Sequence, residues 1–346
     1  EPFLTFSRRR DLRQTGWRMW VGRGEAGAHD NRPLIPEILA LRREKARLLG
    51  FSSFAHWITD DQMAETPQRA LDLMEAVWAP AKARAEEELA RIEALAAVEA
   101  PGTRVEAWDW RYWAEKARRA AFDLDQEQVK PYLQLERLRE AMFWVAGRLY
   151  GLEFALIDDL PVYEPSVRVW RVSRGADEVG LWYFDPYARS GKSSGAWMSE
   201  YRTQERFTGP ITPIVSNNAN FLKAAPGEPV LIAWDDAVTL FHEFGHALHG
   251  LNSDVAFPSL AGTHVARDFV EFPSQLNERW LPTPEVLTRF CRHCVTGEPM
   301  PAELATRLVA ARTFNKGFET VEYLASALID MKAHLAEGAV EPTLFE

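Results

Sequence analysis

The segment Phe241–Gly250, FHEFGHALHG, constrains the fold of this chain more than any other part of it. It contains the pattern H-E-x-x-H, in which two histidines stand four residues apart. On an α-helix such residues lie one turn apart on the same face, so His242 and His246 can offer two imidazole nitrogens to one cation. The pattern therefore predicts a helix that carries a metal site, and Zn²⁺ is the usual occupant of such a site.

The other residues of the segment fit such a helix. Three apolar residues share a second face, which we expect to be buried: Phe241, Phe244 and Leu248. His249 continues the histidine face. Gly245 has no side chain, so another backbone can approach the helix beside the ligands. Gly250 is expected to end the helix.

A glutamate, Glu243, stands directly after the first histidine. In this position a carboxylate reaches a water molecule at the metal and not the metal itself, so it can accept a proton while that water attacks a carbonyl group. Glu243 is therefore a candidate general base. A chance match remains open, in which His242 and His246 are ordinary polar positions of a helix. A catalytic zinc site has three protein ligands, so the hypothesis needs a third one.

The segment 267–280, RDFVEFPSQLNERW, supplies that ligand. Glu271 lies far enough beyond His246 for one helix to end and a second to pack beside it. Four polar residues would share one face of the second helix, opposite Phe269, Val270 and Leu276: Asp268, Glu271, Gln275 and Glu278. Carboxylates on one side of an otherwise apolar helix are costly to bury unless positive charge faces them, which zinc and two histidines would provide. A solvated face is the alternative.

Ligating histidines normally donate their second ring N–H to a carboxylate or a carbonyl group. Asp268 and Glu278 are candidates for this supporting role. His264 precedes Glu271 by seven residues and is a candidate for contact with substrate.

Composition excludes several other classes of protein. The net charge of -10 argues against binding to nucleic acid or to an anionic membrane surface. The only two cysteines, Cys291 and Cys294, provide no disulfide framework, which favours a reducing compartment, and we expect a cytoplasmic location. No apolar run reaches the roughly 18 residues that a membrane span needs. We expect the chain to be a monomer.

Two further motifs carry less weight. CRHC, residues 291–294, has the spacing of a redox motif but lacks its strand–helix context, and we expect its cysteines to be partly buried. SGKSSG, residues 190–195, resembles a phosphate-binding loop, but Pro186 stands where that motif requires glycine. We expect a flexible loop near the cleft.

The pattern along the chain predicts a mainly α fold with a small β-sheet. Helices are expected at 35–49, at 66–100 with Thr66 as N-cap and a kink at Pro80, at 107–123, at 132–150 and from 234 onward. A hairpin is expected within 167–187 around RGADE, and a further strand at 211–217. The change from helical to β-rich sequence patterns at 151 predicts a helical region at 1–150 and a catalytic region at 151–346.

The motifs also carry a family resemblance. WDDAVTLFHEFGHALHGL followed by AGTHVARDFVEFPSQLNERW resembles the M3 family of zinc oligopeptidases, and RDFVEFPSQ resembles its peptidyl-dipeptidase branch. Four other stretches match the same pattern, so the resemblance covers nearly the whole chain: DNRPLIPEILALRREKARLLGF, YFDPYARSGKSSGAWM, TGEPMP and FNKGFETVEYLASALIDM.

The resemblance implies a zincin-like core in a helical, deep-channel architecture, with residues 1–150 forming one wall of the channel. By position it implies that His242, His246 and Glu271 bind one Zn²⁺ per chain and that Glu243 is the general base. The substrates would be short unstructured peptides, cleaved by release of C-terminal dipeptides. The basic residues Arg189, Lys192 and Arg202 are candidates for binding the substrate's terminal carboxylate.

Two alternatives stay open within this resemblance. One is endopeptidase activity like that of oligopeptidase A. The other is a zinc-containing peptide-binding fragment with little turnover, since the sequence has no counterpart of the family's long N-terminal region or of its C-terminal tract resembling GYSAGYYSY. Such a tract supplies hydrogen-bond donors to the tetrahedral intermediate, and loss of one such donor costs about 10²–10³ in rate. We therefore expect this chain to be a fragment.

Overall fold

The computed structural model describes residues 2–338 and 340, which divide into two compact units. The first unit combines Glu1–Asp123 with Ala310–Glu346, and the second is Leu124–Val309. This division differs from the boundary at 151 that the sequence texture predicted, because the helix before 151 contacts the sheet and the last helix contacts the first unit.

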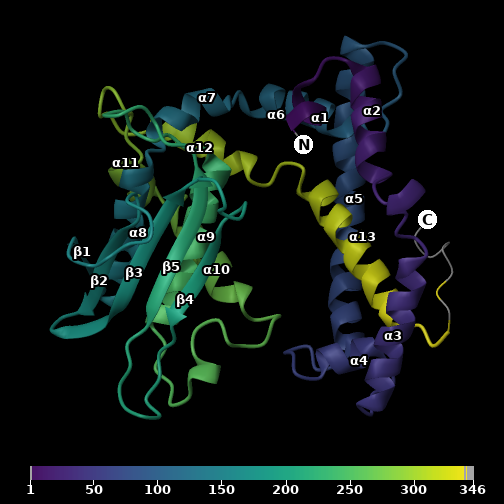
Figure 1. Ribbon diagram of the computed structural model, residues 1–346. Helices are drawn as coiled ribbons and strands as arrows, with labels where there is room; N and C mark the ends of the chain where they lie inside the picture. The colour runs from purple at the N-terminus through teal and green to yellow at the C-terminus, as the bar shows by residue number, and fades with distance from the viewer. Residues whose placement is uncertain (1, 339, 341–346) are drawn as a thin grey trace. The chain divides into compact units, whose positions relative to one another are not determined.

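The first unit consists of helices (Figure 1). They are α1 (Pro2–Phe6), α2 (Arg10–Val21), α3 (Leu34–Leu48), α4 (Phe54–Thr59), α5 (Pro67–Glu99), α6 (Trp110–Phe122) and α13 (Lys316–Leu335), with a 3₁₀ turn at Gly27–His29. The long helix α5 begins at the expected cap, since the Thr66 side chain accepts a hydrogen bond from the backbone of Arg69. Pro80 lies inside α5, which continues to Glu99 as one helix.

Helix α13 packs along α5, and a buried carboxylate of α5 caps its N-terminus. Glu88 is 4% exposed and accepts hydrogen bonds from the backbone N–H groups of Gly317 and Phe318 at 3.2 and 2.9 Å. These N–H groups belong to the first turn, where a helix has no partners of its own. A Cβ at Gly317 would lie 2.5 Å from the backbone of Ala85, so the two helices require glycine at this contact.

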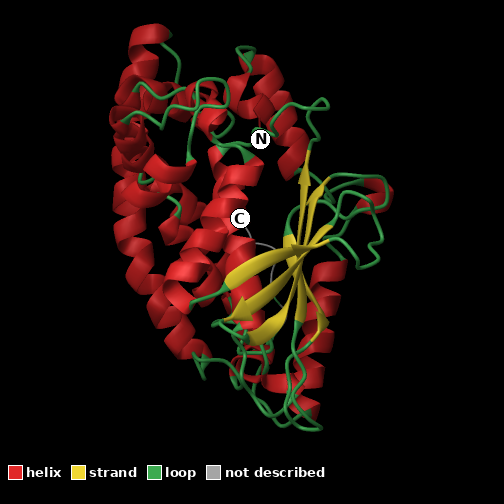
Figure 2. Cartoon of the chain, turned by 90° about the vertical axis from the view of Figure 1, so that its left-hand side faces the viewer, coloured by secondary structure: helices red, strands yellow, loops and turns green. Residues whose placement is uncertain are grey.

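The second unit is built on one five-stranded sheet, which twists strongly (Figure 2). Its strands are β1 (Glu153–Ile157), β2 (Arg168–Arg174), β3 (Asp177–Tyr187), β4 (Trp197–Arg202) and β5 (Ile214–Phe221), in the order β1-β2-β3-β5-β4. All neighbours are antiparallel except β3 and β5, which are parallel. The hairpin of β2 and β3 turns at RGADE as expected, and the strand expected at 211–217 is β5.

The helices of the second unit are α7 (Gln126–Val129), α8 (Leu135–Tyr150), α9 (Trp234–Leu251), α10 (Glu271–Asn277), α11 (Pro284–Phe290) and most of α12 (Ala302–Ala311). Short 3₁₀ turns lie at Lys130–Tyr132, Pro258–Leu260 and Glu278–Trp280. Helix α9 contacts the sheet at β3, β4 and β5, and α8 and α10 contact α9. An aromatic cluster fills the space between sheet and helices: Phe143, Phe154, Trp170, Trp182, Phe184 and Phe244. The protein is therefore mainly α-helical with one small sheet, as the sequence predicted.

Three local expectations were wrong. Gly250 does not end α9, because the helix continues to Leu251 and Gly250 faces Val215 of the sheet. The second motif helix begins only at Glu271, so Asp268 lies in the turn before it. Leu276, expected on a buried apolar face, is 48% exposed, while Ser274 and Asn277 are the buried residues of α10.

Across the part of the chain that the structure describes, no helix combines the length and the apolar character that crossing a membrane would require.

Candidate metal centre

Helices α9 and α10 bring three candidate ligands together. His242 and His246 lie one turn apart on α9, and Glu271 is the first residue of α10. Oε2 of Glu271 lies 3.1 Å from Nε2 of His242 and 3.2 Å from Nε2 of His246. Among the described residues these three form the one group of histidine, cysteine or acidic side chains close enough to hold an ion, with ligand atoms within 4.8 Å of one another.

A hydrogen bond to a second carboxylate fixes the ring of His242. Nδ1 of His242 lies 2.8 Å from Oε1 of Glu278. A carboxylate only accepts hydrogen bonds, so Nδ1 carries a ring proton. In the neutral ring the Nε2 lone pair then faces the carboxylate of Glu271, which suits a cation held between the two atoms. Two imidazoles and one carboxylate are the ligand set of many catalytic zinc sites, so these residues fit Zn²⁺.

The surroundings of His246 and Glu271 favour the metal-binding forms of these two residues. Burial lowers the pKa of His246, which keeps its imidazole neutral. Burial by itself would raise the pKa of Glu271, but the hydrogen bond from Ser274 and the two nearby histidines outweigh it and hold the pKa below its usual range. The Ser274 hydroxyl donates to Oε2 of Glu271 at 2.8 Å and so orients the carboxylate. Neutral histidines and an ionised glutamate are the states that bind metal.

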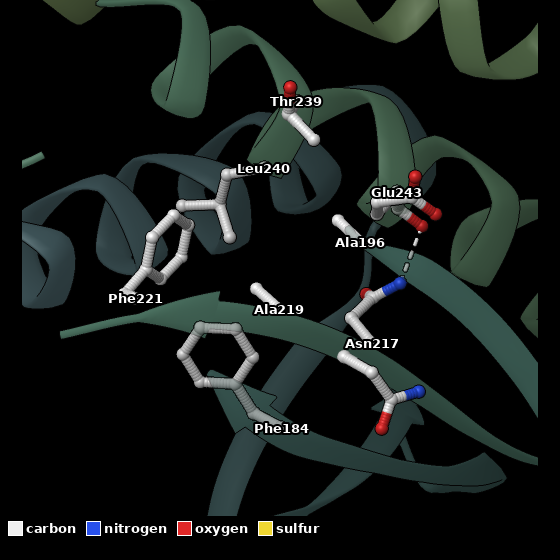
Figure 3. A pocket seen from close by; sticks show the side chains of 9 residues that line it. Phe184, Ala196, Asn217, Ala219, Phe221, Thr239, Leu240 and Glu243 are labelled. Atoms are coloured by element: carbon white, nitrogen blue, oxygen red, sulfur yellow. Dashed lines mark hydrogen bonds between the residues drawn. The ribbon is translucent and has the colours of Figure 1, made fainter. Parts of the chain in front are cut away.

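Glu243 projects from α9 toward the sheet. It lines a small, mostly apolar pocket between α9, β3 and β5 together with Phe184, Ala196, Asn217, Asn218, Ala219, Phe221, Thr239 and Leu240 (Figure 3). Burial in this pocket raises the pKa of the Glu243 carboxyl; the charge of Glu271 raises it too, whereas His242 and a hydrogen bond from the backbone of Met198 lower it. A carboxyl whose pKa is raised toward neutrality suits a group that accepts and returns a proton.

The contact between α9 and α10 leaves no room for a side chain at position 245. A Cβ at Gly245 would lie 2.7 Å from Cα of Ser274 and 2.9 Å from Cβ of Asn277. Gly245 therefore permits the backbone approach that its position beside the ligands suggested. The close approach brings Glu271 within reach of both histidines.

The other candidate residues lie in different surroundings. Glu278 contacts His242, as described above. His249 packs its ring edge-on against Phe269, with ring centroids 6.4 Å apart, and burial lowers its pKa. His264 is half-exposed, with Nδ1 3.8 Å from Oε2 of Glu200 on β4. Asp268 is exposed in the turn before α10. Among them Glu278 hydrogen-bonds to a candidate ligand.

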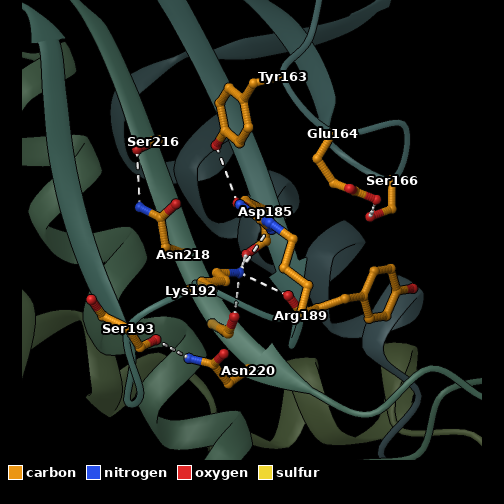
Figure 4. Close-up of polar contacts among 12 residues, drawn as sticks. Tyr163, Glu164, Ser166, Asp185, Arg189, Lys192, Ser193, Ser216, Asn218 and Asn220 are labelled. Atoms are coloured by element: carbon orange, nitrogen blue, oxygen red, sulfur yellow. Dashed lines mark hydrogen bonds and ion pairs between the residues drawn. The ribbon is translucent and has the colours of Figure 1, made fainter.

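The basic residues considered for binding a substrate carboxylate already have partners within the protein (Figure 4). Arg189 forms two hydrogen bonds with the carboxylate of Asp185, at 2.7 and 2.8 Å. Lys192 is 3% exposed and donates to the same carboxylate and to the carbonyl groups of Asp185, Tyr187 and Ala219. Arg202 donates to Thr212. Lys192 is therefore a structural residue and not a substrate ligand.

The same contacts change the interpretation of the loop at 190–195. The buried side chain of Lys192 anchors the loop through the hydrogen bonds given above. Asn220 donates to the carbonyl groups of Ser193 and Gly195, both at 2.8 Å. The loop expected to be flexible is thus tied to β5 by several hydrogen bonds.

Comparison with known proteins identifies the family. The profile of Peptidase family M3 matches residues 3–345. The chain belongs to peptidase family M3. Its fold is accordingly zincin-like, and the resemblance drawn from the two motifs is confirmed. M3 proteins are metallopeptidases, and His242, His246 and Glu271 form a group of side chains that could hold a metal ion.

Individual M3 relatives match along most of this chain. Dipeptidyl carboxypeptidase of Salmonella typhimurium is 44% identical over 344 residues, which are 98% of this chain and 50% of that protein. Dipeptidyl carboxypeptidase of Escherichia coli is 43% identical over 320 residues, 92% of this chain and 47% of that protein. Oligopeptidase A of Salmonella typhimurium is 34% identical over 359 residues, which are 100% of this chain and 53% of that protein. The chain thus spans about half the length of the curated relatives it matches.

Two residues of the site were not found from the sequence. Asn217 on β5 donates through Nδ2 to the backbone carbonyl of Glu243 at 2.6 Å, and Asn277 on α10 donates to the carbonyl of Phe241 at 2.6 Å. An asparagine within a strand or a short helix has no distinctive spacing. The one available signal was the run SNN at 216–218, which together with Asn220 makes four polar residues in the strand IVSNNANF.

Proposed function

We propose that this chain is the metal-binding portion of a zinc peptidase that hydrolyses short peptides by release of their C-terminal dipeptides. His242, His246 and Glu271 would hold one Zn²⁺, and Glu243 would act as general base. The single observation that carries the proposal is the convergence of the two Nε2 atoms on Oε2 of Glu271, 3.1 and 3.2 Å away.

Zn²⁺ in this position would supply Lewis-acid chemistry, since it polarises a carbonyl group and makes water more acidic. The protein's own residues would handle the proton. Glu243 lies one residue beyond His242 with its carboxyl half-buried, so it would take the proton of the attacking water and return it to the leaving amine. Glu278 would keep His242 oriented throughout by holding the proton on Nδ1.

The dipeptidyl mode rests on the relatives. The two relatives with the highest identities given above are named dipeptidyl carboxypeptidases, and oligopeptidase A matches at lower identity. Because this chain covers about half of those proteins, the second candidate is a zinc-containing peptide-binding fragment that turns over little. A monomeric state and a cytoplasmic location stay predictions.

Mass spectrometry of an N-terminally blocked peptide after incubation with the zinc-loaded chain tests the proposal. Successive loss of C-terminal dipeptides is expected, and the variant Glu243→Gln should abolish this loss while it still binds one zinc per chain. Internal cleavage would instead support an endopeptidase. Intact peptide in the presence of one bound zinc would support the binding fragment, and absence of zinc uptake would overturn the proposal as a whole.

A further inference from the structure

The turn of α9 that carries His242 and Glu243 is held from two sides by asparagine side chains. From the sheet, Nδ2 of Asn217 donates to the Glu243 carbonyl at 2.6 Å. From α10, Nδ2 of Asn277 donates to the Phe241 carbonyl at 2.6 Å. The two carbonyls flank the residue His242. Both asparagines are buried, with exposed fractions of 2% and 5%.

These bonds are additional to those of the helix itself. A carbonyl inside an α-helix already accepts the N–H group four residues later, so a second donor is not needed for helix formation. The alternative for a buried amide is an unsatisfied donor, which costs about 1–3 kcal/mol. Each asparagine therefore favours one rotation and one axial position of the helix, namely the one that brings the carbonyl to its amide.

Asn217 is itself oriented by a rigid neighbour. Its Oδ1 accepts a hydrogen bond from Nε1 of Trp182 at 2.7 Å, so the amide cannot rotate without losing that bond. Trp182 is fully buried in the aromatic cluster and stacks on Phe184 with ring centroids 5.0 Å apart. The chain of contacts runs from Trp182 in the sheet through Asn217 to the backbone of Glu243, and Figure 3 shows its last step, the bond of Asn217 to Glu243.

Asn277 belongs to the helix that supplies the third candidate ligand. It lies near the end of α10, and Glu271 lies at its start. The bond of Asn277 to Phe241 and the close contact at Gly245 together fix α10 against α9. The distance from Glu271 to the two histidines depends on this placement, whereas the position of Glu243 over the sheet depends on Asn217.

We propose that Asn217 and Asn277 are positioning residues with separate tasks. Asn277 sets the geometry of the metal ligands, and Asn217 sets the position of the base Glu243. The inference rests on the proposed function, because it assigns the residues to the steps of that reaction. Since a displacement of about 1 Å at a reacting group can cost roughly 10²-fold in rate, a bond to the backbone of Glu243 has a measurable effect.

The test compares the variants Asn277→Ala and Asn217→Ala in the full chain. The zinc dissociation constant is measured by competition with a chelator. The base is examined with acetohydroxamic acid, which binds the metal as acetohydroxamate while its acidic proton goes to a carboxylate beside the metal. Asn277→Ala should weaken zinc binding by roughly 10- to 100-fold. Asn217→Ala should leave zinc binding within about threefold but lower kcat by roughly 10²-fold at similar KM and weaken acetohydroxamate binding.

Two matched controls separate positioning from general loss of stability. Gln204→Ala removes a buried amide whose hydrogen bonds go to the backbone of Val255 and which does not line the Glu243 pocket. Asn252→Ala removes an amide that donates to the Leu248 carbonyl of α9, beyond the ligand turn. Both should lower the melting temperature as much as the test variants do, without the specific effects. Trp182→Phe, which keeps the ring but loses Nε1, should reproduce part of the Asn217→Ala effect.

The outcomes distinguish the inference from the proposed function. If the wild-type chain binds no zinc, the proposed function fails and the positioning roles fail with it. If the wild type binds zinc without turnover, zinc and acetohydroxamate binding still decide both roles. Equal loss of zinc affinity in Asn217→Ala and Asn277→Ala would overturn the division of tasks, and effects no larger than those of Gln204→Ala and Asn252→Ala would overturn the inference entirely.

Discussion

His242 and Glu278 are hydrogen-bonded at 2.8 Å, from Nδ1 of the ring to Oε1 of the carboxylate. The bond lies on the side of the imidazole away from Glu271, so it decides which ring nitrogen can bind metal. Glu278 belongs to the 3₁₀ turn that continues α10, and one short segment thus supplies both a ligand and the support of another ligand.

The first prediction concerns this bond. Glu278→Gln keeps the size of the side chain but removes the charge that stabilises the Nδ1 proton, so we expect zinc affinity to fall roughly 10- to 100-fold. Chelator competition measures the change. Glu285→Gln, at an exposed acidic position in the first turn of α11, is the matched control and should bind zinc like the wild type. Equal affinities for all three proteins would show that Glu278 does not support the site.

The second prediction concerns the contact of α9 with α10. Gly245→Ala places a methyl group 2.7 Å from Cα of Ser274, and backbone cannot give way as a side-chain end can. We expect a loss of stability of roughly 1–3 kcal/mol from overpacking, despite the better helix propensity of alanine, together with weaker zinc binding. Urea unfolding measures the first effect.

Gly16→Ala in α2 is the control for this prediction. The nearest atom to a Cβ there is a ring carbon of Phe3 at 3.6 Å, an ordinary contact. In an uncrowded helix alanine is favoured over glycine by about 0.5–1 kcal/mol, so this variant should be slightly more stable. A Gly245→Ala chain as stable as wild type, with unchanged zinc affinity, would mean that the helices separate at little cost.

The third prediction concerns the first unit. Glu88→Ala removes the acceptor of the Gly317 and Phe318 N–H groups, which leaves the start of α13 without its cap. The expected loss is about 1–3 kcal/mol, and amide exchange in α13 should accelerate. Glu87→Ala changes a mostly exposed residue that pairs with Arg84 on the same helix, and it should exchange like wild type. Identical exchange in both variants would contradict the capping role.

The fourth prediction is a pH dependence at Asp185. Burial by itself would raise the pKa of this carboxyl, but hydrogen bonds from Arg189 and Lys192 outweigh burial and hold the pKa below the ordinary 3.8. Because the folded-state pKa is the lower one, the stabilisation is complete above the unfolded-state pKa and is lost as the pH falls toward the folded-state pKa. Asp185→Asn should therefore cost roughly 3–5 kcal/mol at pH 7, because it leaves Lys192 buried without a counter-charge.

Urea unfolding of the zinc-free chain from pH 7 to pH 3 checks this dependence. The difference in free energy of unfolding between wild type and Asp185→Asn should begin to shrink below about pH 5. A difference that stays constant over this range would show that Asp185 titrates alike in the folded and unfolded chain.

The sequence predicted the parts of the site that local spacing determines. Two histidines four residues apart can bind the same metal ion when they lie on a helix, and α9 is such a helix. The buried stripe of Phe241, Phe244 and Leu248 followed from the same period, and all three are at most 4% exposed. The hairpin of β2 and β3 followed from two β-rich runs around a glycine-containing turn.

The remaining features depend on contacts between distant segments. Gly250 was expected to end α9, but its position against Val215 makes it a packing residue of the sheet. Strand β4 was missed because WMSEYR shows no alternation, and its pairing with β5 decides its conformation. The return of residues 310–335 to the first unit has no local signal, since it depends on the pairing of α13 with α5.

The buried ammonium group of Lys192 gives this fold a chemical reporter. Acylating reagents attack only amines that they can reach, and the carbonyl groups of Asp185, Tyr187 and Ala219 occupy this one in the folded chain. Burial lowers the pKa of Lys192, but this effect ends once the side chain reaches water, so a label on Lys192 reports exposure and not an unusually reactive amine. The rate at which a peptide containing Lys192 gains an acetyl label would therefore report how often the sheet opens at the ends of β3 and β5.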